Sequence, residues 1–300
     1  MSKSVAAIVR LSLSLTFILL LAAAAFAQTE LTGEWTASLE KNDKINLNFK
    51  RLSDKGSKNS MGQSLDFSEL QGLTREQAAG GGAVKFSLVR EAGRVDCEGS
   101  FQNGKGSGTF RFTGSQSFVQ SMKARGFDFE KSSSSRDGEP EPEHRLFAAT
   151  LINVTTALAD DLASAGFGKL DTGDLFKAAI FKVDSKFMRE MKESGYPNMG
   201  MEELVKARIF KIDAGFVSQV VQMGFSKEPF ESLVKMRIFK VTPEFIAEVR
   251  NEGLSDLSVE ELVKMRIFKI DSEFIRQAKA EGVALDVEKL VERRIGVRGK

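Results

Sequence analysis

The second half of the chain repeats itself with a fixed step of 29 residues, and this feature constrains the fold most. LVKMRIFKVTPEFIAEVRNEG at 233–253 returns as LVKMRIFKIDSEFIRQAKAEG at 262–282. The same step separates five glycines, which are Gly166, Gly195, Gly224, Gly253 and Gly282. Self-similarity at a fixed period over several copies is typical of stacked-repeat proteins. The sequence therefore predicts a right-stacked array of αα-hairpin repeats, an α-solenoid.

Each copy is predicted to contain two short helices. The first begins at a capping side chain, which in successive copies is Thr155, Asp184, Asp213, Thr242 and Asp271. Gly253 is placed to end such a helix, and Ser258 with Glu261 forms a capping box for the next. An apolar stripe follows, made by Leu262, Val263, Met265, Ile267 and Phe268. Helices of about ten residues are marginal alone in water, so each copy must bury its stripe against its neighbour.

The array is predicted to span residues 115–300, because weaker matches to the period begin near Phe118. Its first copy is interrupted at about 128–142 by DFEKSSSSRDGEPEP, which is interpreted as a surface loop insertion. The alternative, an ordinary interdomain linker, stays open. The last copy, 287–297, is one residue short of the period, as expected for a terminal cap.

Residues 28–114 are predicted to form an antiparallel β domain of five or six strands, either a half-barrel or a sandwich. Apolar and polar residues alternate through 84–112, and Asn103-Gly104 marks a turn. The glycines of NGKGSG lie between two strands, so a hairpin is favoured over a phosphate-binding loop. Trp35 is predicted to anchor the core, with a ligand platform as the alternative. The fold class is therefore α+β.

The first 27 residues have the layout of a secretory signal peptide, with Lys3 and Arg10 before an apolar run and Ala25-Phe26-Ala27 at its end. An uncleaved membrane anchor is the alternative. Cleavage would leave 41 basic residues, the 43 of the whole chain less Lys3 and Arg10, against 41 acidic ones. A neutral mature chain is not expected to bind nucleic acid through general attraction. We expect an exported protein, periplasmic or extracellular, without a stable membrane span after cleavage.

Two ladders of charge follow the period. Lys206, Lys235 and Lys264 each come four residues after a glutamate, a spacing that favours ion pairs within one helix. Arg208, Arg237 and Arg266 fall inside the apolar arc. Each guanidinium could close helix-end carbonyls or pair with an acid of a neighbouring copy. Alternatively, the three arginines form an anion-binding track for a carboxylate or peptide terminus.

The sequence lacks the motifs that would indicate an enzyme. Its one histidine and one cysteine cannot supply a zinc site, and no Gly-x-Ser-x-Gly elbow or phosphate-binding loop occurs. Cys97 shares a strand face with Val95 and is interpreted as a buried apolar residue rather than a reactive thiol. No catalytic residue, metal ligand or cofactor is predicted, although a hydrolase with paired carboxylates stays open as a weaker alternative.

Several segments together resemble a known family. They are Trp35, LQGL at 70–73, VKFSLVREAGRVDCEGSF at 84–101, GKGSGTFRF at 104–112 and the tandem ELVKMRIFKVTPEFI units. This combination resembles the extracytoplasmic region of bacterial β-lactam-sensing antirepressor metallopeptidases. The zinc motif of the peptidase part does not occur here, so peptidase activity is not implied. The resemblance implies a sensing or binding module of the cell envelope.

Together these features predict a non-catalytic scaffold that binds an envelope protein or peptide through its helical repeats. The alternative is a sensor of a small ligand, such as a cell-wall fragment or a β-lactam, with its pocket in the β domain or at the seam with the array. The oligomeric state is not predicted.

Overall fold

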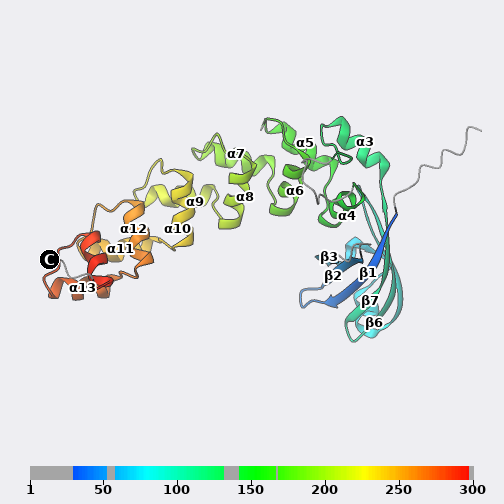
Figure 1. The fold of residues 1–300 in the computed structure, drawn as a ribbon, viewed down its shortest axis with the longest axis horizontal. Coiled ribbons are helices and arrows are strands. Elements are labelled where there is room, and N and C mark those ends of the chain that lie inside the picture. Colours follow the sequence, from blue (N-terminus) through cyan, green and yellow to red (C-terminus); the bar gives the residue numbers. More distant parts are fainter. Residues whose placement is uncertain (1–29, 53–57, 132–141, 167, 297–300) are drawn as a thin grey trace, which may run out of the picture. The chain divides into compact units, whose positions relative to one another are not determined.

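A computed structural model describes residues 30–52, 58–131, 142–166 and 168–296. The predicted signal peptide and most of the predicted loop insertion lie outside these residues. The chain is α+β, with an N-terminal antiparallel sheet followed by helices (Figure 1). It divides into two compact units, one up to Thr156 and one from Ala157 onward.

The first unit contains one seven-stranded antiparallel sheet in the order β3-β2-β1-β7-β6-β5-β4. Its strands are β1 (Glu30–Leu39), β2 (Lys44–Leu52), β3 (Lys58–Asp66), β4 (Leu70–Gln71), β5 (Gly82–Arg90), β6 (Gly93–Gln102) and β7 (Lys105–Gly114). Because the described strands belong to a single sheet that curves as a half-barrel, the sandwich alternative was wrong. The predicted five or six strands were too few, since the Ser- and Gly-rich stretch supplies both β3 and the short β4.

Four helical segments belong to this first unit: η1 (Phe67–Glu69), α2 (Arg75–Gly80), α3 (Gln116–Ala124) and α4 (Pro142–Ile152). The helix α4 contacts β1, β3, β6 and β7, and its Phe147 ring meets the rings of Phe49, Phe110 and Phe112. Contacts therefore group α3 and α4 with the sheet, whereas the sequence analysis placed them in the helical region from residue 115.

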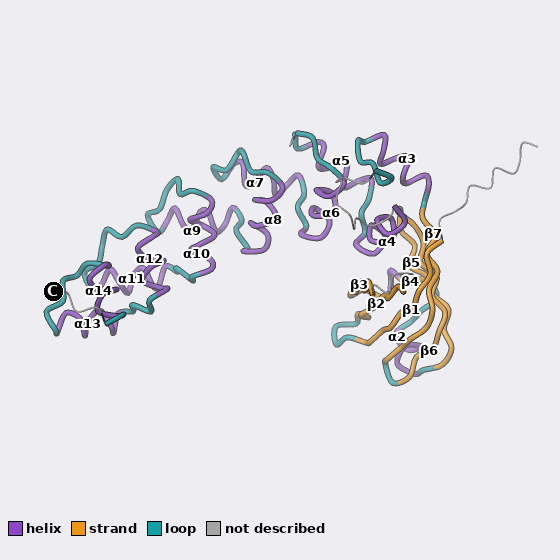
Figure 2. Tube along the Cα trace, in the orientation of Figure 1, coloured by secondary structure: helices purple, strands orange, loops and turns teal. Residues whose placement is uncertain are grey.

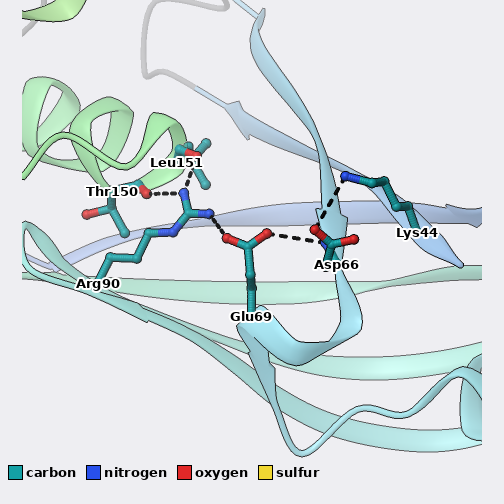
Figure 3. Close-up of polar contacts among 6 residues, drawn as sticks. All are labelled: Lys44, Asp66, Glu69, Arg90, Thr150 and Leu151. Carbon is teal, nitrogen blue, oxygen red and sulfur yellow. Dashed lines mark hydrogen bonds and ion pairs between the residues drawn. The ribbon is translucent and has the colours of Figure 1, made fainter. Parts of the chain in front are cut away.

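Arg90, at the end of β5, fastens α4 to the sheet (Figure 3). Its Nη1 donates to the carbonyl oxygens of Thr150 (2.8 Å) and Leu151 (2.5 Å), and its Nη2 forms an ion pair with Glu69. Helix-end carbonyls lack partners within the helix, so a cation here satisfies them and suits the helix dipole.

Trp35 lies in the core, as predicted. Its side chain is buried, packs edge-on against Phe86 and donates from Nε1 to the Glu98 carbonyl oxygen at 3.2 Å. Gly99 and Gly108 face each other across β6 and β7, where a side chain on either would collide with the backbone of the opposite strand. The next turn, Asn103-Gly104, has φ of 50° and 74°, so the predicted hairpin is confirmed.

The second unit consists of short helices joined by loops (Figure 2). They are α5 (Thr156–Ser164), at the boundary between the units, then α6 (Thr172–Phe181), α7 (Ser185–Glu193), α8 (Met201–Phe210), α9 (Ala214–Gln222), α10 (Phe230–Ile238), α11 (Pro243–Asn251), α12 (Val259–Ile267), α13 (Ser272–Ala280) and α14 (Val287–Arg294). The helices α6, α8, α10, α12 and α14 contact one another in series, and α11 contacts α13. The predicted caps Asp184, Asp213, Thr242 and Asp271 each accept a bond from the first turn of their helix.

Candidate functional site

The three predicted arginines lie on α8, α10 and α12, and each stacks on an aromatic ring of the first helix of its own copy. The guanidinium carbon lies 3.7 Å from the Phe187 ring centre for Arg208, 3.7 Å from Phe216 for Arg237 and 4.8 Å from Phe245 for Arg266. On α14, Arg294 repeats the contact with Phe274 at 4.0 Å. A planar guanidinium over a ring face gains cation–π attraction and covers apolar surface.

The same arginines also close carbonyls at the end of the preceding copy. Arg237 Nη2 donates to the Lys211 carbonyl oxygen at 2.7 Å, and Arg266 Nε donates to that of Phe239 at 3.0 Å. Arg294 donates to the Lys269 carbonyl oxygen. Arg208 differs, because its Nη2 forms a long ion pair with Asp184 Oδ1 at 4.0 Å. Arg237 and Arg266 thus make the helix-end contacts of the structural alternative, and the anion-binding track stays a prediction.

Burial lowers the pKa of Arg237, and Asp213 opposes that effect. The arginine stays charged at any physiological pH, since its ordinary pKa is above about 12. Its contribution is therefore a permanent positive charge held against the ring of Phe216.

A ladder of lysine–glutamate ion pairs joins successive helices. Lys206 Nζ lies 2.6 Å from Glu231, Lys235 Nζ lies 2.5 Å from Glu260, and Lys264 pairs with Glu288. Lys177 pairs with Glu202 at 2.5 Å, and this hydrogen bond raises the pKa of Lys177. The predicted pairing within one helix was wrong for these lysines, because each reaches the glutamate of the next copy.

An exposed isoleucine lies at or beside the C-terminal end of each of α6, α8, α10, α12 and α14, and the sequence pattern does not reveal this exposure. Ile180, Ile209, Ile238 and Ile267 are between 48% and 53% exposed, and Ile295 is 56% exposed. The apolar pattern predicts Ile267 as part of the buried stripe, and this prediction was wrong. Ile267 lies where the helix ends, so the next copy does not cover it.

An exposed lysine follows each of the first four isoleucines by two residues. Lys182, Lys211, Lys240 and Lys269 have φ between 53° and 58°, and none forms an ion pair within the part of the chain that the structure describes. We call these five isoleucines and four lysines the helix-end ladder. The arginine–carbonyl and lysine–glutamate contacts recur between neighbouring copies, so the isoleucines occupy equivalent positions along the series of helices.

A cavity of about 530 Å³ opens elsewhere in the second unit, beside Tyr196. It is lined by Ser194, Gly195, Tyr196, Val217, Val220, Val221, Phe225, Ser226, Lys227 and Glu228. The Tyr196 hydroxyl donates to the Glu228 carbonyl oxygen at 2.8 Å, and burial raises the pKa of Tyr196. The chain has one tyrosine, so this hydroxyl is unique in the sequence.

No group of three or more His, Cys, Asp or Glu side chains among the described residues could hold a metal ion. Cys97 is buried, and burial raises the pKa of its thiol, so it stays protonated.

Comparisons with known proteins give no relatives: no family model, curated protein or solved structure matches this chain. The resemblance to antirepressor metallopeptidases stays a prediction. Among the helices that the structure describes, none alone has the length and apolar character to cross a bilayer, and α4 with α5 meets that test only as a bent pair.

Proposed function

We propose that this chain is an exported, non-catalytic scaffold of the cell envelope. In this proposal its 29-residue units stack as an α-solenoid, and the helix-end ladder is its surface for a protein or peptide. Support for the stacking comes from contacts between copies that recur with the period: the serial packing of α6 to α14, the arginine–carbonyl hydrogen bonds and the lysine–glutamate pairs. Stacked repeats commonly present such extended surfaces.

The exposed isoleucines carry the functional proposal. A single exposed apolar side chain is ordinary on a protein surface. Five at equivalent positions of consecutive copies repeat an apolar feature along the surface, and exposed apolar patches mark interaction sites. Arg237 and Arg266 already contact a ring and a helix-end carbonyl, so we take the exposed isoleucines and lysines as the groups that meet a partner.

Capture from the native envelope tests this proposal. The full chain would be expressed with its N-terminal segment, cross-linked in the cell, and purified with its partners. Ile209→Asp with Ile238→Asp should lower recovery of a defined partner at least about tenfold, since each change puts a charge into an apolar contact. Val221→Asp is the matched control, because Val221 is 49% exposed but lies off the ladder.

Recovery that is the same for the ladder pair and the wild type would contradict the proposal. Fractionation of the same cells tests export: the chain should be found outside the cytoplasm, and removal of residues 1–27 should retain it inside.

The cavity beside Tyr196 favours a second candidate, a small-ligand sensor, although it lies in the helical unit and not in the predicted β domain. Cell-wall fragments and β-lactams would be screened by thermal shift. A raised melting temperature that Val220→Trp abolishes would support this candidate.

A further inference from the structure

We propose that the helix-end ladder binds an acidic chain in the polyproline II conformation, with an apolar side chain at every third residue. This inference rests on the proposed function and names the chemistry of its partner. Three observations carry it: the line of isoleucines, the spacing of the copies and the unpaired lysines.

The isoleucine line is narrow and periodic. Each copy contributes one isoleucine at a helix end, and the same helices carry their paired lysines and glutamates on exposed positions. The apolar surface offered to a partner is therefore one residue wide, with charged side chains beside it. An extended peptide chain fits such a surface better than the flat surface of a folded protein does.

The spacing selects a conformation for that chain. The helices that carry the isoleucines contact their successors directly. Packed helices lie about 8–10 Å apart, so the isoleucines recur at about that step. A polyproline II helix rises about 3.1 Å per residue with three residues per turn, which returns a side chain to one face every ~9.3 Å. A β-strand returns a side chain after about 6.6–6.8 Å, which does not match.

The backbone chemistry of the ladder agrees with this choice. Arg237, Arg266 and Arg294 already occupy carbonyls at the helix ends. The surface therefore has few free backbone groups to pair with a strand. A polyproline II chain needs none, because its backbone stays solvated.

The charges select an acidic partner. Lys182, Lys211, Lys240 and Lys269 are exposed, and Arg208, Arg237, Arg266 and Arg294 add four permanent cations. The loops that follow α6, α8, α10 and α12 contain three acidic residues, Asp184, Asp213 and Asp271. Cations thus exceed acids along the ladder, although the predicted mature chain as a whole is neutral.

An anionic bilayer is the less suitable partner. Glu202, Glu231 and Glu260 are at least 60% exposed and lie on the same helices as the isoleucines. Their charge, even when paired, opposes close approach of a negatively charged plane. A narrow chain can follow the isoleucines and lysines without covering the glutamates.

A designed peptide tests the inference on the full chain without residues 1–27. The probe is fluorescein-labelled (Leu-Glu-Pro)5, which would span about 46 Å at 3.1 Å per residue. Its controls are a peptide of the same composition with the leucines clustered, and a helical peptide with leucine at every seventh residue. Binding is measured by fluorescence anisotropy at low and high salt.

The probe should bind at least about tenfold more tightly than either control peptide, and more weakly as salt rises. Ile209→Asp with Ile238→Asp, and separately Lys211→Glu with Lys240→Glu, should each raise Kd about tenfold or more. Val89→Asp and Lys192→Glu are matched controls and should leave Kd unchanged, since Val89 is 42% exposed, Lys192 is exposed, and both lie off the ladder and outside the Tyr196 cavity.

Equal binding of the clustered peptide, tighter binding of the helical peptide, or equal effects of ladder and control variants would overturn the inference. So would sedimentation with phosphatidylglycerol vesicles in the absence of peptide binding. If the probe fails while the Ile209 and Ile238 changes still abolish capture of an envelope partner, the partner class is wrong and the scaffold proposal stands. If the Ile209 and Ile238 changes also leave capture of the partner unaffected, both the partner class and the scaffold proposal are wrong.

Discussion

Four lysines occupy a backbone conformation that glycine adopts most easily. Lys182, Lys211, Lys240 and Lys269 have positive φ at the ends of α6, α8, α10 and α12. The left-handed region costs a residue with Cβ roughly 1–2 kcal/mol. Each copy therefore holds a lysine where glycine would be less strained, which is consistent with a use for the exposed ammonium groups.

Lys240→Gly should stabilise the chain by about 0.5–1 kcal/mol, because relief of the left-handed strain exceeds the entropy that glycine loses on folding. Lys235→Gly, inside α10, is the opposite-sign control and should destabilise by about 1 kcal/mol. Denaturant unfolding measures both. A destabilised Lys240→Gly variant would show that the lysine makes contacts that outweigh its strain.

The planar shape of the guanidinium, as well as its charge, is predicted to make the arginines stabilise the fold. Arg237→Ala should destabilise by about 1–2 kcal/mol, since it removes a cation–π contact and a hydrogen bond to a helix-end carbonyl. Arg237→Lys should recover less than half of this loss, because an ammonium cannot stack on Phe216 and reach the carbonyl together. Full recovery by lysine, measured by thermal unfolding, would contradict the stacking role.

At this scale the sequence was a good guide to some residues and a poor one to others. Caps and helix-ending glycines depend on local chemistry, and they were predicted. The ion pairs were assigned to the wrong glutamate, because Glu231 lies four residues before Lys235 and twenty-five after Lys206. Only the packing of the helices decides whether Glu231 pairs with Lys235 or with Lys206. The positive φ of the lysines has no sequence signal, because the residue type disfavours it.

At the scale of elements, a buried serine ties two helices of the second unit together. Asp161 on α5 accepts hydrogen bonds from Ser185 Oγ at 2.6 Å and from Ser185 N at 2.7 Å, at the start of α7. The carboxylate thus satisfies an unpaired amide and suits the positive end of the α7 dipole. The bonds from the Ser185 hydroxyl and amide lower the pKa of Asp161.

A lowered carboxyl pKa fixes the direction of a pH effect. The contribution of Asp161 is present above its unfolded pKa of about 3.9 and is lost as pH falls through the lower folded pKa. Asp161→Asn should therefore destabilise by about 1–2 kcal/mol at pH 7, and the difference from wild type should shrink as the pH falls below about 4. Urea unfolding across pH measures the gap. A gap that stays constant down to pH 2.5 would show that the charge is not what matters.

The strands differed from one another in how well the sequence predicted them. Alternation located the strands that pack their apolar faces on the core, such as β5 with Val84, Phe86 and Leu88. It missed the extent of β3, because KNSMGQSLD is mostly polar and pairs only on the β2 side, at the edge of the sheet. The link from Arg90 to α4 joins residues sixty apart and has no local pattern.

At the scale of the whole molecule, the proposal of a solenoid predicts that one unit can be removed. Deletion of 240–268 joins Phe239 to Lys269 and keeps the 29-residue register. Because each copy contacts only its neighbours in a solenoid, the shortened chain should fold with nearly unchanged helicity per residue and a lower melting temperature. Deletion of 240–254 breaks the register and should lose cooperative unfolding. Circular dichroism distinguishes the two, and unfolding of both chains alike would count against the solenoid.

The repeated part of the chain was the more predictable part at this scale, because the period reports helix pairs directly. The surface that we propose as functional was not predictable. Ile209 and Ile238 belong to an apolar run, and a helical periodicity alone assigns such residues to the core. Their exposure follows from where each helix ends against its neighbour, which is a property of the packed units.

Site-specific photo-cross-linking in the cell tests the central claim, that the helix-end ladder is a binding surface, most directly. A photoreactive phenylalanine analogue would replace Ile209, Ile238 or, as the control, Val221, one position at a time in the full chain. The account predicts one discrete adduct from positions 209 and 238 and none from 221. Adducts from 221 alone, or equal labelling from all three positions, would contradict it.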